Sequence, residues 1–557
     1  MPLPKPTGAQ GSADTTDRPP TLNETMTFKQ SWIAWALPAV AALSAATAIA
    51  VMSLAPNFRA RFGPIDDHEP LSWLDGAARL SLSDYFPTLL GRTEVGSFGE
   101  TTRFRPAYYA IRVGLSVLAG DNPIAWYLVS VVAYVATAAT LGYVTSMWLR
   151  VALGTPITTR KLVLLSLYAG LGASLFASMP SWSGVVTRLG PSELWALLGT
   201  SVAALALTHL AVGDRQEWWL PALLATSLAI LSKENFAPLA LATVAVGIYR
   251  SLLQMQSRHN IVWGALGLVP LGLLLAGVAP RLTTNQSDVY GQEIGTSRAS
   301  SALEAVYSTY LFYWGPALFL LIFATLLLFW LPSTSSRLSA LFIATLIIIW
   351  LTWLILDGVV YGGEYSLPRY WIVFESLKNI ALLAVFPIGV AVATRSIGGL
   401  RLAGYVASAA SLITIINATL GIPQSITNLR TESEANAAAT LLYVQEVDAA
   451  LDAAPMTESP SFLLIVHHDI DYEPVFALTT EILRSIPSAR VHVDVSDPLT
   501  TPAVKGLSEV GNRERGLLPI EGLSRALVDV CIFINADPSA VEGCSNDLSF
   551  RVDARAM

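Results

Sequence analysis

The chain has 557 residues, of which 53% are hydrophobic and only 13% are charged, and its formal net charge is −7. Soluble domains carry about 25% charged residues, so this composition predicts a polytopic α-helical membrane protein. The negative net charge argues against nucleic acid as a partner, because nucleic-acid binding requires a basic surface.

A polar tail and a long apolar run begin the chain. Residues 1–30 are rich in Pro, Thr, Gly and Asp and predict a disordered cytoplasmic tail. A transmembrane region of residues 31–427 follows, whose first apolar run is long enough to cross about 30 Å of hydrocarbon. Similar runs recur, and together they predict about eleven spans: 32–54, 123–149, 162–179, 191–212, 217–232, 235–253, 261–279, 308–331, 338–357, 371–394 and 402–421.

Residues 55–122 form a long polar segment after the first span, and they are predicted to be the first outer loop. This segment contains the acidic sequence Asp66-Asp67-His68-Glu69. Residues 71–90 have helical apolar spacing interrupted by charges, which is typical of a helix on the membrane surface. Residues 106–119 are apolar but few, and Arg112 lies in their middle, so they predict a second interfacial helix rather than a span.

The basic residues orient the chain. If residues 106–119 do not cross the membrane and the N-terminus is cytoplasmic, the predominantly basic loops face the cytoplasm, as the positive-inside rule requires. These loops carry Arg150, Arg160, Lys161, Arg215, Arg250, Arg258, Arg337, Arg395 and Arg401. The chain is therefore predicted to lie in the cell or inner membrane, with the first outer loop and the C-terminal part outside the cytoplasm.

Residues 428–557 have the composition of a soluble domain. Three runs, 462–466, 490–495 and 528–534, have the pattern of strands, and 479–485 reads as helical between the first two. This alternation predicts a small extracytoplasmic α/β domain. Its two cysteines, Cys531 and Cys544, form a disulfide if their compartment is oxidising and otherwise remain two thiols.

The predicted topology gathers acids and cations at the outer face of the membrane. Acids there are suited to a general base, and cations to holding a phosphate, in a setting where partial desolvation strengthens their electrostatic interactions. The arrangement suits a lipid-borne phosphate whose tail stays in the bilayer. The residues concerned are Asp66, Asp67, Glu69, Arg103, Arg105, Arg188, Glu193, Lys233, Glu234, Asp288, Asp357, Glu364 and Arg369.

An ordered series of short motifs accompanies these residues over residues 30–395. After the acidic pair come Phe104-Arg-Pro-Ala-Tyr-Tyr109, Leu118-Ala-Gly-Asp-Asn-Pro123, Arg188-Leu-Gly-Pro-Ser-Glu193, Leu231-Ser-Lys-Glu234 and Pro368-Arg-Tyr370. In this order the series resembles the GT-C superfamily of membrane glycosyltransferases, and within it the protein O-mannosyltransferases and the tetratricopeptide-carrying mannosyltransferases. The C-terminal part departs from that branch, because it has no 34-residue repeat.

The resemblance implies a GT-C type fold and an inverting sugar transfer. The donor would be a polyprenyl-phosphate sugar, and the acceptor a hydroxyl of a glycan, lipid or protein outside the cytoplasm. The implied general base is Asp66 or Asp67, with Glu69 either supporting it or facing water. The acidic cluster could ligate a divalent metal, but the resembling branch implies no metal and no other cofactor. The residues predicted to bind the lipid phosphate are Arg105, Arg188, Lys233, Glu234 and Arg369.

Several of these residues also have simpler interpretations. Lys233 and Glu234 could form only a structural ion pair at a helix junction. Arg369 could be an interfacial anchor, and Arg105 could simply begin the surface helix. For the whole chain the alternatives are a secondary transporter, an O-antigen polymerase or ligase type enzyme, and a non-catalytic membrane scaffold. A transporter predicts charges at mid-membrane and paired inverted halves, neither of which the sequence shows.

Overall fold

The computed structural model describes residues 28–284, a few residues between 319 and 326, and residues 368–552. Short gaps lie at 66, 75, 97, 99–102, 155–156, 213–215 and 254–256, and longer ones at 467–472, 496–516, 520–527 and 535–548. The predicted tail at 1–30 therefore lies almost wholly outside the described residues. In the helix bundle the longer helices are α1 (Phe28–Leu54), α5 (Pro123–Leu153), α6 (Thr159–Ala177), α8 (Glu193–Val212), α9 (Trp219–Ser232), α10 (Leu239–Leu253), α11 (Ser257–Leu266), α12 (Val269–Thr284), α16 (Pro368–Arg395) and α17 (Gly399–Leu420).

Seven helices of the described residues are long and apolar enough to cross a membrane, which supports a helical membrane protein. The predicted number of eleven is not confirmed. Helices α9 and α10 have 14 and 15 residues, so each is only about 21–23 Å long. The predicted span 338–357 lies outside the described residues, and so does most of 308–331.

Small residues allow the central helices to pack closely. A Cβ at Gly142 of α5 would lie 2.4 Å from the backbone nitrogen of Ala173 and 2.6 Å from the carbonyl oxygen of Ala169, both in α6. Gly199 of α8 approaches the backbone of α9 in the same way. Such contacts between small residues are typical of helix pairs within membranes, where van der Waals packing drives association.

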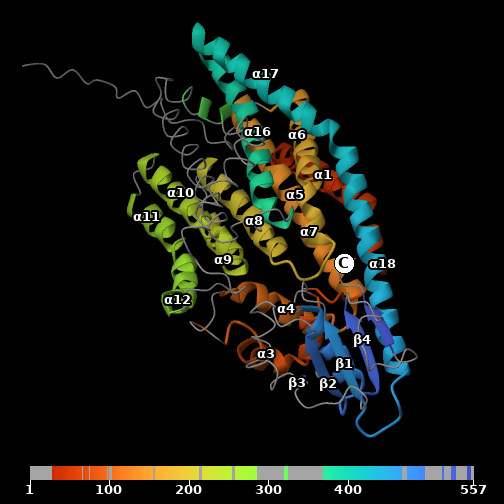
Figure 1. The fold of residues 1–557 in the computed structure, drawn as a ribbon. Coiled ribbons are helices and arrows are strands. Elements are labelled where there is room, and N and C mark those ends of the chain that lie inside the picture. Colours follow the sequence, from red (N-terminus) through yellow and green to blue (C-terminus); the bar gives the residue numbers. More distant parts are fainter. Residues whose placement is uncertain are drawn as a thin grey trace, which may run out of the picture.

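The first outer loop contains several short helices instead of one long surface helix. Its elements are α2 (Glu69–Trp73), the 3₁₀ turn η2 (Leu82–Asp84), α3 (Tyr85–Gly91) and α4 (Pro106–Leu118). The prediction of a continuous helix over 71–90 was wrong. Helix α2 ends at Trp73, and Gly76 further on has a φ of 83°, a left-handed conformation that no continuous helix contains and that glycine adopts most readily. Helices α3 and α4 lie at one end of the bundle (Figure 1).

A long helix connects the bundle to a parallel sheet. After α17, Gly421 is followed directly by α18 (Ile422–Asp452), so the predicted boundary at residue 428 falls inside a helix. Figure 1 shows α18 running along the bundle to the strands, at the same end as α3 and α4. The strands are β1 (Ser461–Val466), β2 (Arg490–Val495), β3 (Leu517–Pro519), β4 (Val530–Ile534) and β5 (Ser549–Val552), in the order β3-β2-β1-β4-β5.

The sheet is packed against α18 and against α19 (Glu473–Ser485). Tyr443 and Val447 of α18 share an apolar core with Phe462 of β1 and Ile482 of α19. In addition, the Arg484 guanidinium of α19 lies 2.5 Å from the carboxylate of Asp121, which precedes α5. The sheet is thus joined both to α18 and to the end of the first outer loop.

Candidate active site

Asp67 joins residues 60–68, which we call the acidic loop, to the segment between α6 and α8. Its side chain is only 1% exposed. One carboxylate oxygen accepts backbone N–H groups from Leu189 at 2.8 Å and from Gly190 at 3.1 Å, and the other accepts the N–H of Gly63 at 3.2 Å. Hydrogen bonds to an ionised acceptor are among the stronger ones in proteins. The carboxylate therefore fixes the two segments against each other.

The segment 178–192, which we call the α6–α8 connector, is held from several other elements. Asn57 donates to the Val186 carbonyl at 2.8 Å. The Thr187 carbonyl accepts from the Tyr127 hydroxyl at 3.3 Å and from the Asn436 amide of α18 at 2.5 Å. The backbone is therefore hydrogen-bonded on both sides of Arg188, whose side chain is half-buried.

The other end of the connector is held by a carboxylate from α16. Glu375 is buried, and one of its oxygens accepts both the backbone N–H of Ser181 at 3.1 Å and its hydroxyl at 2.5 Å. Two acids, Asp67 and Glu375, thus position the connector by accepting its backbone N–H groups. The sequence reasoning did not identify Glu375, which lies inside a predicted span.

Helix α4 brings a buried arginine to the acidic loop. Arg112 is 2% exposed, donates to the Tyr108 hydroxyl, and lies 3.4 Å from the carboxylate of Glu69. The Tyr108 hydroxyl in turn donates to the Gly190 carbonyl at 2.5 Å. Burial raises the pKa of the Glu69 carboxyl, and nearby Arg112 offsets only part of this effect. Glu69 is thus an acid at the edge of the cluster, with a third of its side chain exposed.

Arg105 forms the centre of a second ionic group. Its guanidinium donates twice to Glu94, at 2.5 and 3.1 Å, and once to the Tyr109 hydroxyl at 3.3 Å. Glu234 lies near the same arginine. Although burial opposes its ionisation, Lys233, Arg103 and Arg105 lower the pKa of the Glu234 carboxyl to about 2. Glu234 therefore stays negative and balances a cationic surrounding.

Lys233 forms an ion pair across the bundle. Its ammonium lies 3.2 Å from the carboxylate of Glu193 at the start of α8, and both side chains are at most 6% exposed. This pair joins the start of α8 to the junction that follows α9. Lys233 is next to Glu234 in the chain and also pairs with Glu193, the last residue of the motif at 188–193.

The structure therefore brings Glu69, Arg105, Lys233 and Glu234 into neighbouring ionic groups. Arg188 lies in the connector, and Asp67 is hydrogen-bonded to that connector. Asp66 lies outside the described residues, and so does the side chain of Arg369 in the first turn of α16. The sequence did not identify Glu94, Arg112 and Asn436 as residues that hold the site together. The charge of Arg112 within an apolar run was the one signal available for them.

The described residues contain no group of three His, Cys, Asp or Glu side chains arranged to hold a metal ion. The chain matches no model of a known protein family, and a comparison with curated proteins finds no similar sequence.

Proposed function

We propose that the chain is an integral membrane glycosyltransferase that transfers a sugar from a polyprenyl-phosphate donor to an extracytoplasmic hydroxyl with inversion. The observation that carries the proposal is the polar cluster around Asp67, Glu69 and Arg105 at one end of an apolar helix bundle. A substrate with a charged phosphate and a long apolar tail matches such an arrangement. The ordered motifs that resemble the GT-C superfamily supply the type of reaction.

Within this proposal Asp66 is the general base and Asp67 a positioning residue. Both oxygens of Asp67 already accept backbone N–H groups, and the side chain is nearly inaccessible. A base must reach the acceptor hydroxyl within hydrogen-bond distance, which a buried and fully engaged carboxylate does poorly. Asp66 directly precedes Asp67 in the sequence, and the hydrogen bonds of Asp67 are proposed to position the base.

Arg188 is the proposed cation for the leaving phosphate. It directly precedes the two backbone N–H groups that bind Asp67, so the segment that carries Arg188 is hydrogen-bonded to the loop that carries the proposed base. A guanidinium can bind phosphate through two parallel hydrogen bonds, whereas an ammonium acts as a point charge. Lys233 and Arg105 are engaged with Glu193 and Glu94 and are proposed to shape the positive field around the site.

The disulfide supports the proposed orientation. Cys531 in β4 is disulfide-bonded, and the chain has only one other cysteine, Cys544, which lies outside the described residues. Disulfides persist in oxidising compartments and are rare in the cytosol. The sheet and the end of the bundle that it contacts are therefore proposed to face away from the cytoplasm.

The test is a transfer assay on the full chain in nanodiscs, with labelled polyprenyl-phosphate hexoses and pentoses and envelope glycans as acceptors. Asp66→Asn is expected to lower the rate by about 10²–10⁴-fold, because it removes the general base. Arg188→Gln is expected to lower it by about 10²-fold or more, as loss of a charge-stabilising donor does. Glu432→Gln, an exposed change on α18, is the control that keeps wild-type activity. Full activity of Asp66→Asn would contradict the assignment of the base.

A further inference from the structure

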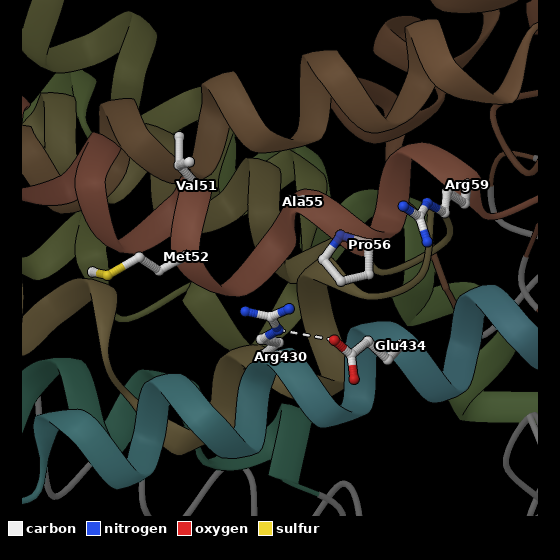
Figure 2. A pocket seen from close by; sticks show the side chains of 7 residues that line it. All are labelled: Val51, Met52, Ala55, Pro56, Arg59, Arg430 and Glu434. Carbon is white, nitrogen blue, oxygen red and sulfur yellow. Dashed lines mark hydrogen bonds and ion pairs between the residues drawn. The ribbon is translucent and has the colours of Figure 1, made fainter.

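A groove lies where α18 passes the end of α1. It is lined by Val51 and Met52 of α1, by Ala55, Pro56 and Arg59 of the following 3₁₀ turn η1 (Ala55–Arg59), and by Arg430 and Glu434 of α18. Its volume is about 270 Å³. Figure 2 shows the guanidinium groups of Arg59 and Arg430 on either side of Pro56.

Both walls of the groove change from apolar to charged at the same level. No charged residue occurs between Lys29 and Arg59, and none occurs between Arg401 and Arg430. The first uncharged run is in α1, and the second covers α17 and the start of α18. Arg59 ends the first run, Arg430 ends the second, and both line the groove. Cations are placed in this way where a membrane span meets the phosphate layer of the bilayer.

The composition of the groove matches a lipid rather than a soluble anion. Val51 and Met52 are 64% and 48% exposed on the span itself, so they offer apolar contact below the two arginines. The Nε of Arg430 donates to Glu434 at 2.8 Å, which orients the guanidinium from one side. Arginine binds phosphate through paired N–H groups, and its terminal nitrogens are the ones that Glu434 does not engage.

We propose that this groove binds the phosphate headgroup of an anionic phospholipid, with Arg59 and Arg430 on the phosphate and Val51 and Met52 along the acyl chain. The site is separate from the proposed sugar-transfer site, because none of its lining residues belongs to the cluster around Asp67 and Arg105. It lies on α18 at a short distance from Asn436 and Thr440, which hold the connector and the acidic loop. A bound lipid would therefore stabilise α18 beside the active end.

The test measures lipid affinity by native mass spectrometry of the full chain in neutral detergent. The probes are phosphatidylglycerol, phosphatidylcholine with the same acyl chains, and glycerol 1-phosphate. Wild-type protein is expected to retain phosphatidylglycerol in preference to phosphatidylcholine and to bind no glycerol phosphate. Arg59→Gln and Arg430→Gln are each expected to weaken phosphatidylglycerol binding by about fivefold, the usual effect of one basic residue near an anionic lipid surface.

Two further variants make the result specific. Arg490→Gln, at an exposed position in β2 that does not line the groove, is expected to leave lipid binding unchanged. Glu434→Gln removes the competing carboxylate and is expected to strengthen phosphatidylglycerol binding, so it tests the proposal even if the arginine variants do not fold. Unchanged affinity in Glu434→Gln, equal binding of the two lipids, or equal binding of glycerol phosphate would overturn the proposal.

Discussion

At the scale of single residues, two adjacent aspartates of the same loop have different surroundings. Asp67 accepts three backbone N–H groups from two segments that are more than a hundred residues apart in the chain. No sequence pattern identifies such a role, because the donors are backbone groups and any residue type carries them. The sequence could therefore name the acidic pair but could not separate its members.

Replacing the Asp67 carboxylate by an amide is expected to destabilise the fold. In Asp67→Asn the new NH₂ group must face at least one backbone N–H, because both oxygens of the carboxylate accept such donors. Leaving a buried donor unsatisfied costs roughly 1–3 kcal/mol of unfolding free energy. The unfolding midpoint in detergent should therefore fall in Asp67→Asn and stay unchanged in Glu432→Gln. An unchanged midpoint in Asp67→Asn would contradict the positioning role.

The loss of folding stability at low pH is expected to depend on the Glu234 carboxyl. Its pKa is about 2 in the folded protein, against an ordinary value of 4.5. The ionised form therefore stabilises the fold above about pH 4.5, and this contribution is lost as the pH falls toward 2. Glu234→Gln is expected to cost roughly 1–3 kcal/mol at pH 7 and to flatten the loss of stability below pH 4.5.

The measurement is the unfolding midpoint of the protein in detergent between pH 7 and pH 3. Glu432→Gln, at an exposed position on α18, should lose stability in parallel with the wild-type protein. If Glu234→Gln also follows the wild-type curve in parallel, the ionic group around Arg105 does not stabilise the folded state.

At the scale of elements, hydrophobic runs predicted the long helices well and the short ones poorly. The apolar pattern identified α1, α5, α6 and α8, because a span of this length leaves an unmistakable stretch of sequence. It failed for residues 71–90, where the apolar spacing is helical but Gly76 adopts a positive φ. Whether a glycine takes that conformation depends on the contacts of the folded chain and not on local sequence.

The close crossing of α5 and α6 should tolerate no larger side chain at its centre. Gly142→Val would place side-chain atoms within 2.4–2.6 Å of the α6 backbone unless the helices separate. Overpacking of this kind costs typically 1–3 kcal/mol, so the unfolding midpoint should fall. Gly272→Val of α12 is the matched control, because nothing lies within 4 Å of its Cβ position. Equal midpoints in the two variants would argue against the crossing.

At the scale of the whole molecule, long-range contacts decide the candidate site. Arg112 is 43 residues from Glu69, and Asn436 is 249 residues from Thr187. The sequence placed Arg105, Lys233 and Glu234 on the list of site residues through their motifs. It could not supply Glu94 or Asn436, because their importance follows only from the elements that they contact, and for Arg112 it offered only a charge within an apolar run.

The proposed orientation predicts the accessibility of the C-terminus. A protease-cleavable tag after Met557 should be removed by external protease in spheroplasts with intact membranes. A matching tag before Met1 should resist until the membrane is permeabilised, because the N-terminus is proposed to be cytoplasmic. The opposite pattern of cleavage would refute this topology, and with it the proposed extracytoplasmic acceptor.

Helix α18 mechanically links the sheet to two segments of the candidate site. With 31 residues it is a rod about 46 Å long, attached to the sheet near its far end. Midway along it, Thr440 accepts the backbone N–H of Arg61 in the acidic loop, and Asn436 donates to Thr187 in the α6–α8 connector. Both segments are thus fastened to one stiff body within a single turn. A load applied to the sheet would displace them together, and their mutual spacing would survive the movement.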